Sequence, residues 1–99
     1  MNYKVYHKNE MEFGFGDAPK TFNSNDYKLI AEIRSENLAD TFRITNHIDH
    51  NWKNNEEVIK TYVANPRSTS VGDIIEDENG TFYYCATVGW EEIKAMEEV

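Results

Sequence analysis

In two stretches near the start of the chain, apolar and polar residues largely alternate. These stretches are residues 3–7 and residues 27–34. In the second stretch, Tyr27, Leu29, Ala31 and Ile33 make one apolar face, and the charged Lys28, Glu32 and Arg34 lie between them or after them. Side chains at every second position share one face of a strand. We therefore predict a strand over each stretch, with a single apolar face on the second.

A helical spacing follows the second predicted strand. Leu38 and Phe42 lie four residues apart, which places them on the same face of a helix. Ser35 or Asn37 can cap the first turn, since both residue types accept hydrogen bonds from exposed backbone N–H groups. The pattern predicts a helix over residues 37–48, packed on the sheet through Leu38 and Phe42.

A hairpin is predicted near the C-terminus, where residues 73–77 and 81–88 flank the pair Asn79-Gly80. Asn-Gly is typical of a two-residue type I′ turn, which needs two positive φ angles. In that register the facing pairs are Ile75 with Tyr84 and Ile74 with Cys85. Both faces of the hairpin base are then apolar, which indicates a strand buried between two layers.

Three further stretches give weaker patterns. Residues 57–63 fit a strand or a short helix, and their β-branched content favours the strand. Residues 8–26 are irregular, because Gly and Pro interrupt them. Residues 91–99 contain strong helix formers and predict a short acidic helix or a frayed end, with 94–99 the part most prone to fray.

Together these elements predict one α+β domain over residues 1–99. We expect a small, mostly antiparallel sheet of four or five strands with one helix packed on a face. A small β-barrel is the alternative topology. A length of 99 residues with 13% aromatic content suffices for one compact core and leaves no room for a second domain.

The charge is concentrated in the last quarter of the chain. The net charge is −8, and residues 73–99 carry eight acidic side chains against the single Lys94. This field opposes direct nucleic acid binding and suits a basic partner surface, although it also serves solubility. An alternative is a protein that mimics DNA, if the acidic residues form one stripe. Those residues are Asp73, Glu76, Asp77, Glu78, Glu91, Glu92, Glu97 and Glu98.

Several features indicate a cytoplasmic protein without membrane contact. The first residues contain no long apolar stretch, and no run approaches the length of about 18 apolar residues that a membrane span needs. Cys85 is the only cysteine, which excludes an internal disulfide. It lies in an apolar stretch, so we expect a buried and inert thiol.

The segment from Arg67 to Gly72 has the composition of an anion site. A guanidinium, three hydroxyl groups and a glycine can cradle a phosphate or a phosphate-bearing nucleotide. The candidate ligand residues are Asn46, His47, Arg67, Ser68 and Ser70. The structural alternative is that the two serines cap a turn while Arg67 pairs with Asp49 or Asp73.

No catalytic or metal-binding constellation has sufficient support. His47, Asp49 and His50 offer ligand atoms, but Asp49 lies off the helix face that the two histidines share. Ser68, His47 and Asp49 match a Ser-His-Asp composition that occurs by chance in most sequences. We expect no enzymatic activity, no metal and no cofactor.

A family resemblance covers residues 27–93. It is carried by Thr45-Asn46-His47-Ile48-Asp49, Trp52, Arg67-Ser68-Thr69-Ser70-Val71-Gly72-Asp73, Phe82-Tyr83-Tyr84 and Val88-Gly89-Trp90-Glu91-Glu92-Ile93. These segments resemble small proteins of phages, plasmids and other mobile elements. The second half is similar to the YodL-like domain of Gram-positive bacteria, in which a related Arg-Ser-x-Ser-Val-x-Asp segment precedes a strand.

The resemblance implies an accessory protein of a phage or mobile element that binds and modulates a protein in the host cytoplasm. YodL-like proteins are linked to binding a bacterial actin homologue and to altered cell shape. The present chain departs from them in residues 8–26 and at Trp90, and no target is carried over. Candidate contact residues are Phe13, Phe15, Trp90, Glu91 and Glu92.

Overall fold

The computed structural model of the chain describes residues 1–9, 22, 24–46, 52, 56–63, 66–86 and 89–94. Six strands, one α-helix and a short 3₁₀ helix make up this part of the chain. In order they are β1 (Asn2–Lys8), η1 (Ser24–Asp26), β2 (Tyr27–Arg34), α1 (Leu38–Thr45), β3 (Val58–Thr61), β4 (Ile74–Glu76), β5 (Phe82–Cys85) and β6 (Trp90–Ile93).

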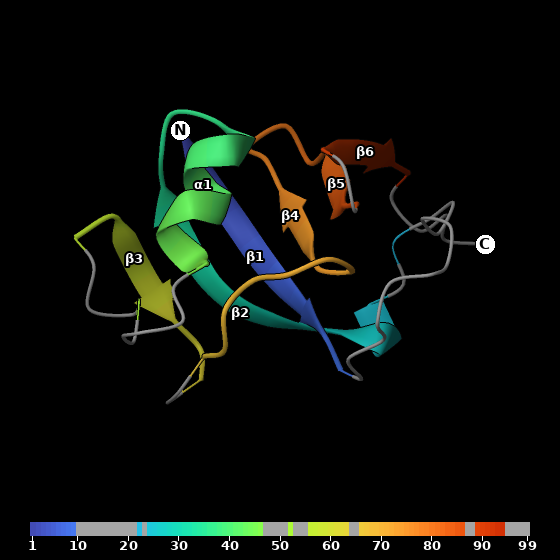
Figure 1. Cartoon of the computed structure of the whole chain (residues 1–99), viewed down its shortest axis with the longest axis horizontal. Helices are drawn as coiled ribbons and strands as arrows, with labels where there is room; N and C mark the ends of the chain where they lie inside the picture. The colour runs from blue at the N-terminus through green and yellow to red at the C-terminus, as the bar shows by residue number, and fades with distance from the viewer. Residues whose placement is uncertain are drawn as a thin grey trace.

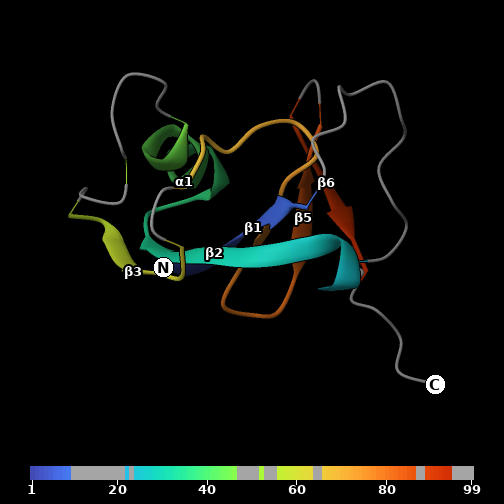
Figure 2. The ribbon, with the colours of Figure 1, turned by 90° about the horizontal axis from the view of Figure 1, so that it is seen from below.

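The strands form one sheet in the order β3-β2-β1-β4-β5-β6, and every neighbouring pair is antiparallel. β1 crosses the middle of the sheet, and α1 lies over one face (Figure 1, Figure 2). The predicted α+β fold is confirmed. Four or five strands was too small a number, because a sixth strand forms at residues 90–93. In the described part of the sheet, β3 and β6 are opposite edges, which is the arrangement of an open sheet and not of a barrel.

The sixth strand occupies part of the segment for which the sequence predicts an acidic helix. β6 pairs with β5, with Trp90 opposite Cys85 and Ile93 opposite Phe82. Gly89 has a φ of +73° and directs the chain into this strand. Ile93 is buried by the pairing, and this nonlocal burial outweighs the helix propensity of the neighbouring glutamates. Residues 95–99 lie outside the described part.

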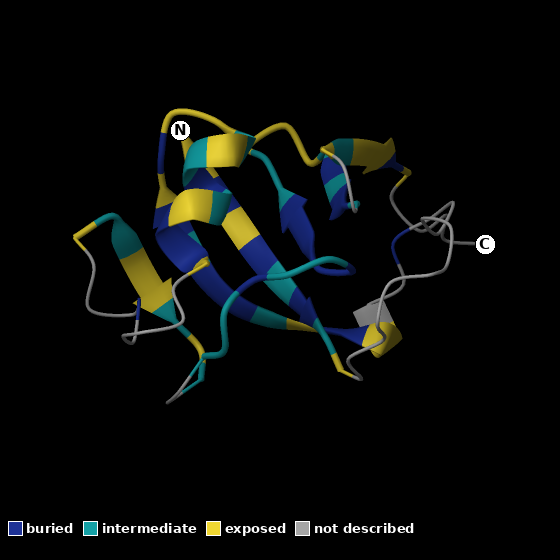
Figure 3. Cartoon of the chain, viewed as in Figure 1, coloured by how far each residue is buried: buried dark blue, intermediate teal, exposed yellow. Residues whose placement is uncertain are grey.

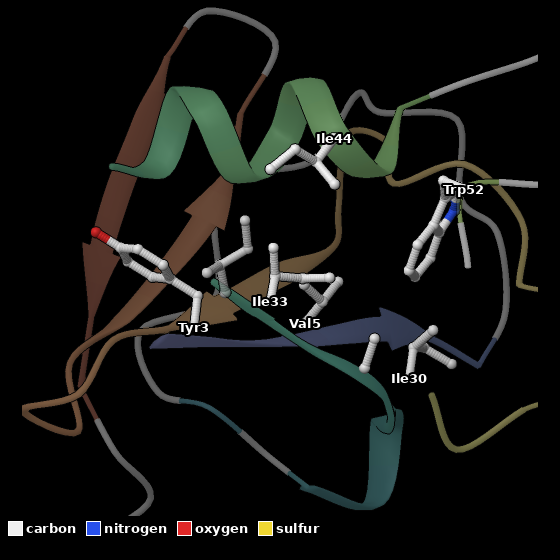
Figure 4. Packing of buried hydrophobic residues seen from close by; sticks show 8 residues of the cluster. Tyr3, Val5, Ile30, Ile33, Ile44 and Trp52 are labelled. Carbon is white, nitrogen blue, oxygen red and sulfur yellow. The ribbon is translucent and has the colours of Figure 1, made fainter. Parts of the chain in front are cut away.

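An apolar cluster lies on each face of the sheet, and β4 contributes to both. Ile75 and Ile74 point to opposite faces, and both are fully buried. The helix-side cluster consists of Tyr3, Val5, Ile30, Ala31, Ile33, Ile44, Trp52 and Ile75 (Figure 4). The far-side cluster consists of Phe22, Tyr27, Ile74, Phe82, Tyr84 and Ile93. The prediction of apolar residues on both faces of the hairpin base is confirmed, and most of β4 is buried (Figure 3).

A bulge in β2 changes the face to which its side chains point. Val5 pairs with Ala31, whereas the next residue of β1, Tyr6, pairs with Leu29. Ile30 is therefore an extra residue, and the alternation of faces is interrupted there. Ala31 lies on the helix side and Leu29 on the far side, so the predicted single apolar face of this strand is wrong.

β4 pairs with β5 one residue away from the predicted register. Ile74 lies opposite Tyr84 in place of Cys85, and Ile75 lies opposite Tyr83 in place of Tyr84. A shift of one residue changes which side chains of the two strands lie on the same face of the sheet. Tyr84 consequently joins Ile74 in the far-side cluster.

The chemistry of the turn explains the shifted register. The Asp77 carbonyl accepts the Gly80 N–H at 3.1 Å, and the Asp77 carboxylate accepts the N–H groups of Asn79 and Thr81. Gly80 has a φ of +81°, whereas Asn79 does not have a positive φ. This arrangement is a type I turn followed by a glycine bulge, which takes three loop residues. The predicted type I′ turn is therefore wrong.

α1 is shorter than the predicted helix over residues 37–48 and ends at Thr45. Asn37 is the N-cap, and its Oδ1 accepts the Asp40 N–H at 2.8 Å. The hydroxyl of Ser35, the other predicted cap, donates to the Asn37 carbonyl at 3.1 Å. The cap removes one unsatisfied N–H group from the first turn, which typically stabilises a helix by about 1 kcal/mol.

The face of α1 that packs on the sheet is partly polar. Ile44 is fully buried together with Thr41 and Thr45, and the Thr45 hydroxyl donates to the Thr41 carbonyl at 3.0 Å. Internal hydrogen bonds of this kind allow buried hydroxyl groups without a large desolvation cost. Leu38 packs against the helix-side cluster as predicted, whereas Phe42 is only partly buried and contacts the β6 edge.

The ambiguous segment at residues 57–63 forms the edge strand β3, so the preference for a strand is confirmed. Thr61 lies opposite Ala31, and Val58 packs against the helix-side cluster. Ile59 and Tyr62 are 49% and 42% exposed. β3 therefore contributes little to the core and mainly completes the sheet.

Candidate functional site

The loop before β4 contains a buried ion pair. The side chain of Asp73 is 1% exposed and that of Arg67 is 30% exposed. The guanidinium Nη1 lies 2.7 Å from Oδ2 of Asp73, and Nη2 lies 2.8 Å from Oδ1. A two-point contact of this kind fixes both the charge and the orientation of the guanidinium. Of the two partners proposed for Arg67, Asp73 is in contact, while Asp49 lies outside the described residues.

Two backbone N–H groups complete the surroundings of the Asp73 carboxylate. The Ser70 N–H donates to Oδ2 at 2.8 Å, and the Lys8 N–H donates to Oδ1 at 2.9 Å. Each carboxylate oxygen thus accepts one bond from the guanidinium and one from the backbone. The segment cradles an anion as its composition suggests, but this anion is the protein's own carboxylate. The Arg67–Asp73 pair is the ion pair that the structural alternative predicts.

His7 extends this network from the central strand. Its Nε2 lies 2.9 Å from Oγ1 of Thr69 and 4.0 Å from Oδ2 of Asp73. Burial of the imidazole lowers the pKa of His7 from 6.5 to about 4; the negative charge of Asp73 opposes this shift, and the charge of Arg67 adds to it. His7 is therefore neutral at pH 7 and serves as a buried hydrogen-bonding group.

Trp52 joins the same network from a distant part of the chain. Its side chain is 1% exposed, and its indole N–H donates to the Arg67 carbonyl at 3.0 Å. The carbonyl of Thr45, the last residue of α1, accepts the Thr69 N–H at 3.0 Å. The helix end is thus tied to the loop by backbone, whereas the Asn46 side chain is exposed. His47 lies outside the described residues.

An open pocket of about 260 Å³ lies at the C-terminal end of β1, and we call it the basic pocket. Its lining residues are His7, Lys8, Asn9, Lys28, Ile30, Val63, Pro66 and Arg67. The sequence suggested Arg67 but not Lys8 or Lys28, because Lys28 looks like an ordinary solvent-facing strand residue and Lys8 begins the segment predicted to be irregular. The β1–β2 pairing places Lys28 opposite His7, and the Lys8 backbone is bonded to Asp73, so both lysines border the same pocket as Arg67.

An open groove of about 490 Å³ lies at the other end of β1, and we call it the acidic groove. It is lined by Asn2, Tyr3, Lys4, Glu32, Glu76, Asp77, Glu78, Asn79 and Gly80. The Tyr6 hydroxyl donates to Oε1 of Glu76 at 2.9 Å, and the Asn2 N–H donates to Glu78. Four carboxylates against one lysine give this end of the sheet a negative potential.

The predicted protein-contact residues divide into described and undescribed positions. Trp90, on edge strand β6, is partly buried, and its ring lies edge-on to Phe42 of α1 with centroids 5.9 Å apart. Glu91 and Glu92 follow on the same strand and are exposed. Phe13 and Phe15 lie outside the described residues.

The acidic stripe expected of a DNA mimic does not form among the described residues. β5 lies between β4 and β6, so Glu76 and Glu91 are two strands apart. Two strand spacings correspond to about 9.6 Å, so these two carboxylates do not lie side by side as the predicted stripe requires. Asp73 is not available to a partner either, because Arg67 neutralises it in the interior. Glu97 and Glu98 lie outside the described residues.

The other reactive candidates show no exposed chemistry in the described part of the chain. Cys85 is buried, and burial, together with the charge of Asp73, raises the pKa of its thiol to about 11, as expected for an inert cysteine. The described residues contain no group of His, Cys, Asp and Glu side chains arranged to hold a metal ion. His47, Asp49 and His50 lie outside them. Among the described helices, none has the length and apolar character to cross a membrane.

Comparison of the chain with protein-family models, curated proteins and solved structures gave no match. The resemblance to YodL-like proteins therefore stays a hypothesis that rests on the quoted sequence segments.

Proposed function

We propose that this chain is a non-enzymatic accessory protein of a phage or other mobile element, which binds and modulates a protein in the host cytoplasm. The observation that carries the proposal is the composition of the β6 edge. There a partly buried Trp90 lies beside two exposed carboxylates, Glu91 and Glu92. The proposed activity needs no cofactor.

The β6 edge has the features of a protein-contact surface. Energetically important contact residues are commonly Trp side chains that are held in place and surrounded by polar groups. Phe42 holds the Trp90 ring from the helix side. Glu91 and Glu92 belong to adjacent positions of one strand and so point to opposite faces of the sheet. A partner that binds this edge would contact one carboxylate on each face of the sheet, which favours a basic partner surface.

Charge reversal at the β6 edge tests the proposal. Tagged protein is incubated with a lysate of a Gram-positive host, captured proteins are identified by mass spectrometry, and the enriched protein is purified for direct titration. We expect the double variant Glu91→Lys/Glu92→Lys to weaken that binding at least about tenfold, with a marked dependence on salt. The matched control is Glu56→Lys, an exposed reversal beside the opposite edge strand, which should bind normally.

Two results would count against the proposal. Equal affinity of the double variant and the wild type would remove β6 from the contact surface. Failure to enrich any host protein reproducibly would remove the support for a host target. Circular dichroism of each variant verifies that the sheet is intact.

A further inference from the structure

Basic side chains line the basic pocket, although the chain as a whole is acidic. The protein carries a net charge of −8. Yet Lys8, Lys28 and Arg67 are among the eight described residues that line this pocket; none of these eight is acidic, although Arg67 is paired with Asp73. A concave site lined by one sign of charge concentrates ligands of the opposite sign. The local chemistry therefore selects an anion.

The Arg67 side chain borders the basic pocket and is already held in a fixed orientation. Its guanidinium is held by Asp73 at two points and by the Ser68 carbonyl, which lies 2.9 Å from Nη1. Its side chain is nevertheless 30% exposed and borders the pocket. A donor group that is already fixed loses little conformational entropy when a ligand arrives.

The remaining lining adds an apolar component. Ile30, Val63 and Pro66 border the same pocket, and Asn9 adds an amide group. A volume of about 260 Å³ is smaller than the roughly 300–1,000 Å³ typical of sites for drug-sized molecules. The pocket therefore suits a small ligand with one charged end and one apolar end.

From this juxtaposition we infer that the basic pocket binds a small organic phosphate. Lys28 and Arg67 contact the phosphate group, and Val63 and Pro66 contact the apolar substituent. Asp73 offsets the charge of Arg67, but an ammonium and a guanidinium together still favour a phosphate group over a carboxylate, because guanidinium groups match phosphate oxygens particularly well. A nucleic acid strand is a poor alternative, because the net charge of the chain repels an extended row of phosphates.

Three probes distinguish the components of this inference: phenyl phosphate, inorganic phosphate and benzoate. Binding to the full chain is followed by two-dimensional NMR. The reporter signals are the backbone N–H of Lys8 and the indole N–H of Trp52, which donate to Asp73 and to the Arg67 carbonyl respectively. We expect phenyl phosphate to bind most tightly, inorganic phosphate more weakly, and benzoate at least about tenfold more weakly than phenyl phosphate.

Lys28→Ala is the decisive variant, because Lys28 is exposed and its truncation leaves the Arg67–Asp73 pair intact. It should weaken phenyl phosphate binding at least about tenfold. The matched control Lys4→Ala removes an exposed lysine of the acidic groove and should have no effect.

Four outcomes would overturn the inference. They are no shift of the reporter signals at millimolar phenyl phosphate, equal binding of benzoate, equal binding of inorganic phosphate, or normal binding by Lys28→Ala. The inference does not depend on the β6 edge, since Glu91→Lys/Glu92→Lys should still bind phenyl phosphate.

Discussion

At the C-terminal end of β1 the carboxylate of Asp73 is buried and fully paired, whereas at the N-terminal end Glu76 and Glu78 border an open groove. The two ends thus use the same chemical group in opposite ways. Buried and neutralised, the carboxylate fixes a loop against the central strand. At the surface, carboxylates retain their solvent and contribute to the field that a partner encounters.

Not all of the negative charge of the chain is available to a partner. The charge of −8 includes Asp73, which acts within the fold and not on a partner. Among the described residues, the carboxylates at the acidic groove and on β6 are accessible to a partner, whereas Asp73 is not. We therefore expect a substitution at Asp73 to lower the stability of the fold, and a substitution of a carboxylate at the other end of β1 to leave the stability nearly unchanged.

The largest expected effect comes from Asp73→Ala. The substitution leaves the Arg67 guanidinium without its partner and the N–H groups of Ser70 and Lys8 without an acceptor. Removing one member of a buried ion pair typically costs about 3–5 kcal/mol. We expect the lower end, about 3 kcal/mol, since the Arg67 side chain is partly exposed and can turn to solvent. Urea unfolding measures the loss.

The matched substitution at the other end of β1 is Glu78→Ala. It removes an exposed acceptor, so the free energy of unfolding should change by no more than about 0.5 kcal/mol. A loss of similar size for both variants would show that the proposed difference between the two ends is wrong.

The second expected effect is a dependence of stability on pH through His7. Its folded pKa is about 4, against 6.5 for the exposed group. The unfolded chain binds the proton more readily, so the stabilising contribution is complete above pH 6.5 and is lost as the pH falls toward 4. The loss approaches about 1.4 kcal/mol per pH unit in that range, or about 3 kcal/mol in total.

His7→Gln isolates this contribution from the titration of the carboxylates. Glutamine can keep a hydrogen bond to Thr69 but does not titrate. The difference between the unfolding free energies of wild type and variant should therefore change between pH 7 and pH 4. A constant difference over this range would contradict the assignment of the slope to His7.

Local sequence patterns predicted the elements whose causes are themselves local. The Asn37 cap lies within the first turn of α1, and Arg67 and Asp73 are six residues apart on one loop. The hairpin was located for the same reason. The predicted register of the hairpin was wrong because the side chain of Asp77, two residues before Asn79, stabilises a turn with three loop residues in place of two.

The features that the sequence did not predict depend on distant pairing. Ile93 forms a strand because it meets Phe82, although its neighbours favour a helix. The basic pocket is another case, since Lys28 reaches Arg67 only through the pairing of β2 with β1. Neither pairing can be recognised in a short window of sequence. For this reason the predicted sheet had too few strands, and Lys8 and Lys28 were not among the predicted site residues.

The smallest expected effect concerns two Tyr–Glu hydrogen bonds beside the acidic groove. The Tyr6 hydroxyl donates to Glu76 at 2.9 Å from a partly buried position, and the Tyr62 hydroxyl donates to Glu32 at 2.7 Å from an exposed one. Burial and the bond to Glu76 raise the pKa of Tyr6. Tyr6→Phe should lower stability by about 0.5–1 kcal/mol, a typical net value for one hydrogen bond. Tyr62→Phe should leave the urea midpoint unchanged, because water replaces the lost contact. If instead Tyr62→Phe destabilises the protein as much as Tyr6→Phe does, the carboxylates at this end are structural groups, and the contrast with Asp73 fails.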